Sequence, residues 1–274
     1  MRKLLVLAAL ALVAGLITLG GNQAQAINPV ICGDTLSTAN TTTTLTHDLT
    51  CATAPGLTIG ADGITLDCAG HKITGPGSGA GILLSGVSGV TVKNCKVENF
   101  AVGISLQSSD GNFLVKNNVT GSTSIGSGGF TLVGSDGNVL EKNEAEDNTG
   151  RGFLLGGDSD DNFLVNNEAK NNGFRGFDAE GSSDGNVLFK NEAKDNGSAG
   201  FVVGTGSTDN TLKDNEAKDS IAEGFAMLSP GNLLVDNETS GNGSFGIRDS
   251  TGPANTYIGN TCSEVPDSSP TGLC

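Results

Sequence analysis

The sequence predicts an all-β fold: a single-stranded, right-handed parallel β-helix, or solenoid, of about nine coils of 22–26 residues. Three observations predict it. Asparagines recur every 22 to 26 residues, a second asparagine follows each of them by five positions, and apolar residues recur in the same register. A period in the low twenties fits one coil per repeat, in which each unit buries its apolar face by stacking on its neighbours.

Two columns of asparagine define the repeat. The first contains Asn112, Asn138, Asn162, Asn186, Asn210, Asn232 and Asn255. The second contains Asn117, Asn143, Asn167, Asn191, Asn215, Asn237 and Asn260. An asparagine directed into the coil can bond turn backbone and donate its amide to the asparagine one coil away. Because a catalytic residue is not needed seven times over, we expect both columns to be structural and the second to form a ladder.

Each repeat, as in residues 162–185, holds three strand-sized segments separated by Asn, Gly and Asp. Apolar residues never accumulate with a helical period, which excludes the α-solenoids. The L-x-x-L-x-L-x-x-N frame of leucine-rich repeats is also absent. A parallel β-helix is the solenoid that remains.

Three columns are expected to face the core. Leucine lies two residues after the first asparagine, as at Leu164, and alanine lies seven after it, as at Ala169. The third column is the apolar member of a repeated Gly-apolar pair: Leu57, Ile82, Ile104, Phe130, Phe153, Phe177, Phe201, Phe225 and Ile247. The preceding glycine indicates a sharp bend or a close backbone approach before this strand.

The N-terminus has the pattern of a secretory signal peptide. Arg2 and Lys3 precede an apolar run, and Ala24 and Ala26 form a small-x-small cleavage site. We expect cleavage after Ala26, no later transmembrane segment, and a secreted or periplasmic location. The expected divisions are a signal peptide (1–26), an N-terminal cap and first coil (27–62), the β-helix (63–261) and a C-terminal tail or cap (262–274).

Six cysteines, all after the leader, fit an oxidising compartment. The repeat register suggests the pairs Cys32–Cys51, Cys68–Cys95 and Cys262–Cys274, although six cysteines allow fifteen pairings. A zinc site would require CxxC spacing or nearby histidines, and the sequence has neither.

The formal net charge of −15 makes nucleic acid an unsuitable partner. Aspartates precede successive asparagines by two residues, including Asp136, Asp160 and Asp184. Like charges about one coil apart repel, and a hard cation such as calcium would relieve the repulsion. Asp-Gly is also ordinary turn chemistry, and the GGxGxD calcium repeat is missing. No cofactor is certain, and calcium is the one that the sequence allows.

The stretch GITLDCAGHKITGPGSG, followed by N-x-L-x-x-N-x-A units, resembles the right-handed β-helix repeat proteins of the pectin-lyase-like superfamily, close to the NosD-type periplasmic group. The resemblance covers nearly the whole chain after the leader. It implies the fold but no single activity, because the superfamily contains lyases, hydrolases, epimerases, adhesins and proteins of no known activity. It also suggests copper, but two histidines and one methionine after the leader are a poor ligand supply, so copper is not expected.

In the lyase and epimerase relatives, the resemblance places the saccharide on the outer face of one parallel sheet. The matching strand here is the Gly-apolar one, whose outward column is mostly small or apolar. The exception is local: Arg151 and Arg175 are 24 residues apart and therefore stacked, with Asp178 and Glu180 on the same strand. An arginine beside carboxylates could serve as a lyase base or a uronate clamp, whereas ordinary surface pairing is the simpler interpretation.

A further column, just after the first asparagines, alternates with the leucine core and should face outward; it includes Phe113 and Phe163. Such a stripe can be an interaction face, and self-association is one use for it, unless long neighbouring side chains cover it.

The sequence therefore predicts a secreted, rigid, non-catalytic scaffold that binds carbohydrate or a cell-surface component. The alternative is a calcium-assisted polysaccharide lyase or uronate epimerase that acts on the outer face of the Gly-apolar sheet.

Overall fold

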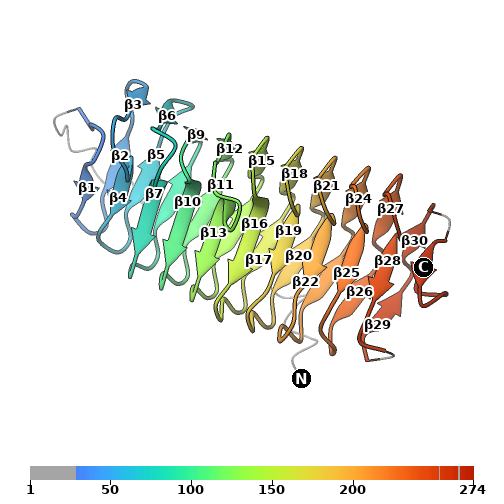
Figure 1. The fold of residues 1–274 in the computed structure, drawn as a ribbon. Helices are drawn as coiled ribbons and strands as arrows, with labels where there is room; N and C mark the ends of the chain where they lie inside the picture. Colours follow the sequence, from blue (N-terminus) through green and yellow to red (C-terminus); the bar gives the residue numbers. More distant parts are fainter. Residues whose placement is uncertain (1–28, 253, 265) are drawn as a thin grey trace.

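A computed structural model describes residues 29–252, 254–264 and 266–274 (Figure 1). The predicted leader and its cleavage site lie outside these residues. The described chain contains strands and turns but no α-helix, and it winds as an elongated stack from the N-terminal to the C-terminal end (Figure 1). No described helix is long and apolar enough to cross a membrane.

The strands form three parallel sheets. Sheet A has eleven strands, in spatial order β1 (Thr35–Leu36), β4 (Leu57–Ile59), β7 (Ala80–Ser85), β10 (Val102–Gln107), β13 (Gly128–Val133), β16 (Arg151–Gly156), β19 (Phe177–Ala179), β22 (Phe201–Val203), β25 (Phe225–Met227), β28 (Ile247–Asp249) and β31 (Ser268–Ser269). Sheet B has ten, β2 (Thr42–Thr44), β5 (Thr65–Asp67), β8 (Thr91–Lys93), β11 (Phe113–Val115), β14 (Val139–Glu141), β17 (Phe163–Val165), β20 (Val187–Phe189), β23 (Thr211–Lys213), β26 (Leu233–Val235) and β29 (Thr256–Ile258). Sheet C also has ten, β3 (Leu49–Thr50), β6 (Lys72–Thr74), β9 (Lys96–Glu98), β12 (Asn118–Thr120), β15 (Glu144–Glu146), β18 (Glu168–Lys170), β21 (Glu192–Lys194), β24 (Glu216–Lys218), β27 (Glu238–Ser240) and β30 (Thr261–Cys262).

Each coil passes through sheets A, B and C in turn, so neighbours within a sheet are three strands apart in sequence. Phe153 pairs with Phe177 in sheet A, and Ala169 pairs with Ala193 in sheet C. Residues 24 positions apart are therefore adjacent, and the predicted parallel β-helix is confirmed.

Sheet A has eleven strands and sheets B and C have ten each, which makes about ten turns and agrees with the prediction of about nine coils. The two strands of sheet A beyond the nine counted from the sequence are β1 and β31, at the ends of the stack. Neither contains the Gly-apolar pair from which the coils were counted, because a terminal coil is covered on one side only and does not need a full core residue.

The core is built from stacked identical side chains. The rings of Phe130, Phe153, Phe177, Phe201 and Phe225 lie parallel, with centroids 4.7 to 4.8 Å apart. The leucine and alanine columns are also buried. Gly176 shows why glycine precedes the phenylalanines: a Cβ there would lie 2.6 Å from the carbonyl oxygen of Gly200 and 2.9 Å from the Cβ of Ala193. Close backbone approach explains this column.

Three asparagine ladders run along the stack: both predicted columns form one, and a third column lies beside them. In the second predicted column, Asn143 Nδ2 donates to Asn167 Oδ1 at 3.1 Å. The additional ladder lies five residues further along each coil, where Asn148 Nδ2 donates to Asn172 Oδ1 at 2.9 Å. Its members have the same 24-residue spacing, so the sequence contained the signal.

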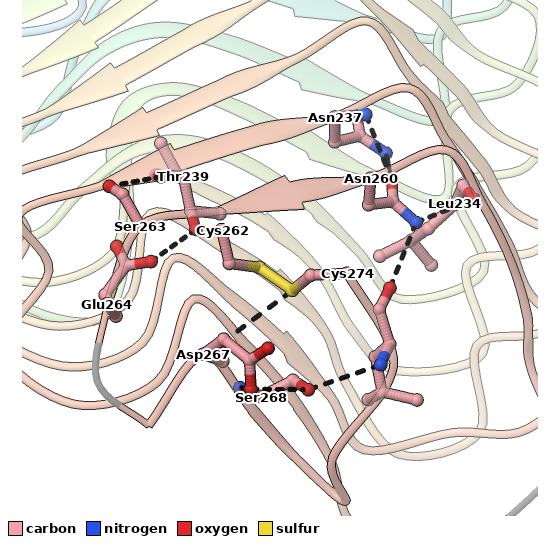
Figure 2. Close-up of a disulfide and its surroundings, with 12 residues drawn as sticks. Leu234, Asn237, Thr239, Asn260, Cys262, Ser263, Glu264, Asp267, Ser268 and Cys274 are labelled. Atoms are coloured by element: carbon pink, nitrogen blue, oxygen red, sulfur yellow. Dashed lines mark hydrogen bonds between the residues drawn. A yellow bond between two sulfur atoms is a disulfide. The ribbon is translucent and has the colours of Figure 1, made fainter.

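Three disulfides join the pairs that the repeat register suggests, Cys32–Cys51, Cys68–Cys95 and Cys262–Cys274. Figure 2 shows the last of these in the C-terminal cap, close to the end of an asparagine ladder. Nearby, the carboxylate of Glu264 ends the additional ladder by accepting from Asn242 Nδ2 at 2.6 Å and Thr239 Oγ1 at 2.6 Å. A carboxylate suits this place because it accepts several hydrogen bonds and requires no acceptor of its own.

Candidate functional site

The four charged residues predicted at the candidate site lie together on the outer side of sheet A. Arg151 opens β16 and Asp178 lies in the next strand, β19. Arg175 precedes β19 by two residues, and Glu180 follows it directly. The register places Asp178 beside Leu154 of β16, so the Arg151 side chain reaches across one coil. We call these four residues the Arg/Asp cluster.

Asp178 is the centre of the Arg/Asp cluster. Its Oδ2 atom accepts from Nε of Arg151 and, at 2.7 Å, from Nη1 of Arg175. Glu180 bridges the same two arginines: Nη2 of Arg151 lies 3.1 Å from its Oε1, and Nη1 of Arg175 lies 3.4 Å from its Oε2. Arg151 also donates to the carbonyl oxygen of Gly126 at 2.7 Å. Two cations and two anions thus form one ion-paired network.

An aromatic ring completes the cluster. The guanidinium carbons of Arg151 and Arg175 lie 5.3 and 4.7 Å from the ring centroid of Phe174, within the range of a cation–π contact. Phe174 was not identified from the sequence, because no other coil has an aromatic residue directly before an arginine.

Solvent exposure increases from the centre of the cluster outward. The Asp178 side chain is 0% exposed, that of Arg175 is 21% exposed and that of Glu180 is 38% exposed. The second oxygen of Asp178, Oδ1, has no hydrogen-bond partner among the described residues. Asp178 therefore binds the arginines from their buried side, and a ligand that approaches from solvent would contact Arg175 and Glu180 first.

The rest of the outer face of sheet A is close-packed. In its outward column, Thr131, Leu154, Val202 and Ala226 are all buried. Ala199, Val202 and Ala226 form a small apolar cluster, with Leu228 packed against it. Adjacent parallel strands lie only about 4.8 Å apart, so neighbouring side chains shield one another even on an outer face. The Arg/Asp cluster interrupts this close-packed surface.

The two histidines lie elsewhere. His71 Nδ1 lies 3.0 Å from Asp48 Oδ1 near the N-terminal cap. Since Leu49 pairs with Ile73, His47 occupies the equivalent position one coil earlier. Neither imidazole is near sheet A strands β16 and β19, so the cluster contains arginines and carboxylates but no histidine.

The aspartates predicted to bind calcium, Asp136, Asp160 and Asp184, form a column at the corner before sheet B. Each carboxylate accepts a backbone N–H from the following coil; the amide of Asp184, for example, donates to Oδ1 of Asp160 at 2.7 Å. Burial, followed by repulsion from Asp136 and Asp184, raises the pKa of Asp160. Within the described ranges, no three His, Cys, Asp or Glu side chains are arranged to hold a metal ion. The aspartate column has a structural role, because it accepts backbone N–H groups from the next coil. Calcium binding by these aspartates stays a prediction.

A protein-family model described as periplasmic copper-binding protein (NosD) matches residues 58–261. This match covers most of the chain. The chain belongs to the NosD family. No curated protein matches it.

Several solved structures share the fold of this NosD-family protein. The periplasmic alginate epimerase AlgG has a TM-score of 0.60 and 17% identity, over 78% of this chain and 60% of its own. The A-module of the Azotobacter vinelandii mannuronan C-5 epimerase AlgE4 has a TM-score of 0.50 and 14% identity, over 83% and 80%. Pectate lyase Pel9A has a TM-score of 0.50 and 16% identity, over 87% and 71%. These TM-scores show a shared parallel β-helix fold, and the chain spans about three-fifths of the length of AlgG.

The family description mentions copper, but the described residues do not fit a copper site. All six cysteines are in disulfides, Met227 is buried in the core, and the two histidines lie at the N-terminal end. Copper sites require imidazole, thiolate or thioether donors that converge. The family and the disulfides do indicate a periplasmic or secreted protein.

Proposed function

We propose that this NosD-family protein is a non-catalytic, rigid β-helix that binds carbohydrate at the Arg/Asp cluster of sheet A. The observation that carries the proposal is the pair of guanidinium groups held beside Phe174 on a face whose other outward residues are mostly small or apolar. Planar donors next to an apolar ring suit a sugar, which presents hydroxyl groups along its edge and C–H groups on its face.

Uronates are the sugars that this chemistry favours most. Glu180 is the most exposed anion of the cluster, and its 3.4 Å contact with Arg175 is the longest one. A uronate carboxylate could replace Glu180 on Arg175 without disturbing the buried bond between Arg175 and Asp178. Charge-assisted bonds of this kind are stronger than neutral ones.

The lyase or epimerase alternative would use the same cluster. It requires a group that removes a proton from the sugar, and here each arginine is already a donor to two carboxylates. The likeness to alginate epimerases and a pectate lyase supports the fold without supplying a base. We therefore favour binding without turnover.

A glycan array on the mature protein, followed by calorimetry, tests the proposal. We expect binding, strongest for uronate oligosaccharides, and a loss of affinity of about tenfold or more in Arg175→Ala, because one charged hydrogen bond is worth about 1.5 to 3 kcal/mol. Arg248→Ala is the matched control: Arg248 lies on the same sheet, pairs with Glu223 at 2.9 Å and is outside the cluster.

The same samples test the alternative. Polyuronate is incubated with and without calcium, and the ultraviolet absorbance of an unsaturated product and the epimer ratio by NMR are recorded. Turnover that disappears in Arg175→Ala would replace the binding proposal with an enzyme. If the protein neither binds nor converts any uronate, both the binding proposal and the enzyme alternative are refuted.

A further inference from the structure

The outer face of sheet B is largely apolar from β11 to β20. Two outward columns, separated by the buried leucines, contribute Phe113, Val115, Val139, Phe163, Val165, Val187 and Phe189, with Glu141 as the one charged member. Thr211 and Lys213 of β23 end the strip. The register joins them into one surface, since Phe113 pairs with Val139 and Phe163 with Val187. We call this surface the sheet B face. Phe113 is 36% exposed, and most of the other members are partly exposed. A contiguous apolar surface of this kind marks an interaction site.

The two edges of the sheet B face carry opposite charges. At the corner before each strand stand Asp110, Asp136, Asp160 and Asp184, which form the acidic edge. From β11 to β20, the corner after the strand carries Lys116, Lys142 and Lys190, which form the basic edge, with Asn166 between the last two; after β23 and β26 the same corner carries Asp214 and Asp236. In three coils the aspartate and the lysine are six residues apart in sequence, so they bracket the same strand. The face is therefore an apolar strip between an anionic border and a cationic border.

This charge pattern selects one occupant and one orientation. Two copies can stack their sheet B faces around a two-fold axis that runs either along the helix axis or along the strands. If the two-fold axis runs along the helix axis, each coil faces the equivalent coil of the partner, and the acidic edge of one copy lies over the basic edge of the other. If it runs along the strands, the two acidic edges face each other and so do the two basic edges. Facing sheets are about 10 Å apart, within reach of a lysine and an aspartate that approach from opposite sides.

We propose that the sheet B face binds a second copy of this chain, with the two helix axes parallel and each acidic edge against the partner's basic edge. The surface is self-complementary, as a two-fold interface requires. Burial of the apolar strip supplies affinity, and the edges supply orientation. The inference is independent of carbohydrate binding, because sheet A is not involved.

Local contacts are compatible with this arrangement. Lys142 pairs with Glu141 at 2.6 Å, and the Lys190 ammonium lies 5.1 Å from the ring centroid of Phe189. Both ammonium groups thus remain at the border of the strip, where a partner's aspartate would approach them. Asp110 Oδ1 accepts the amide of Asp136 at 2.9 Å, so Asp110 is fixed in place while its charge remains exposed.

Sedimentation of the mature protein at roughly 100 µM gives the first result, since any dissociation constant in the micromolar range would populate the dimer there. We expect a dimer, and a monomer in Phe163→Asp. Ile221→Asp is the matched control, because Ile221 is an exposed isoleucine at a corner outside sheet B. Circular dichroism of both variants verifies that the strands are retained. A monomeric wild type overturns the proposal.

Charge reversal tests the orientation. Lys116→Asp alone and Asp110→Lys alone should each raise the dissociation constant roughly tenfold, because two symmetry-related ion pairs become two like-charge contacts. An equimolar mixture of the two variants should form heterodimers, since every such contact is then attractive. If Lys116→Asp alone strengthens association, like edges face each other and the proposed orientation is wrong. If neither variant changes the dissociation constant and the mixture associates no more tightly than either variant alone, the acidic and basic edges are not in contact in the dimer.

Discussion

Asn167 joins three coils: its Oδ1 accepts from Nδ2 of Asn143 at 3.1 Å, and its own Nδ2 donates to Asn191 Oδ1 at 3.0 Å. The same Nδ2 also donates to the carbonyl oxygen of Leu140 at 2.8 Å. All of these groups are buried. An amide in mid-ladder therefore satisfies donors and acceptors that water cannot reach.

Loss of one ladder amide should be costly. Asn167→Ala is expected to lower the free energy of unfolding by about 1 to 3 kcal/mol, because it leaves buried polar groups without partners. Urea denaturation measures the change. Asn255→Ala, in the partly exposed last position of another ladder, should cost less. Equal losses at both positions would contradict the importance of burial.

The phenylalanine column should be more sensitive still. Phe177 is fully buried and stacked on both sides, so Phe177→Ala is expected to cost about 3 to 5 kcal/mol. Thermal melting followed by circular dichroism records the loss. The control is Phe113→Ala on the sheet B face, which should change stability far less in the monomer. A mild effect at Phe177 would show that the stacked rings can repack.

Glu168 should make stability depend on pH. Burial raises its pKa above the ordinary value of 4.5, and repulsion from Glu144 and Glu192 adds to the effect. A carboxyl group with a raised folded-state pKa costs nothing below the unfolded value, and its charge destabilises the fold progressively as pH rises above that value. Glu168→Gln should therefore stabilise the protein at neutral pH and have no such effect well below pH 4.5. Denaturation at both pH values measures it, and a larger gain at the acidic value would contradict this account.

Asp160→Asn tests the calcium prediction. Asparagine keeps an oxygen that can accept from the Asp184 amide but removes a charge that its neighbours repel. The variant should melt at a higher temperature than the wild type without calcium, and it should lose any rise in melting temperature that calcium produces in the wild type. An equal calcium-dependent rise in both proteins would place the cation elsewhere.

The sequence was sufficient for the stacking register because the asparagine, leucine and phenylalanine columns repeat with little variation. The same spacing predicts that Arg151 and Arg175 lie on adjacent coils. The terminal strands were missed because capping coils do not follow the repeat. The burial of Thr131 and Val202 was also missed, because it depends on how neighbouring side chains shield an outward position, which periodicity does not encode. Phe174 occurs in its position only once, so no column could reveal it.

The most direct test of the proposed function is an NMR titration of the mature protein with the oligosaccharide that the glycan array selects. The arginine Nε–Hε signals identify the cluster, and Arg248 provides an internal reference. The account predicts that the signals of Arg151 and Arg175 shift together as ligand is added, whereas that of Arg248 stays unchanged. Shifts confined to sheet B, or an unchanged Arg175 signal in a complex that has formed, would contradict it.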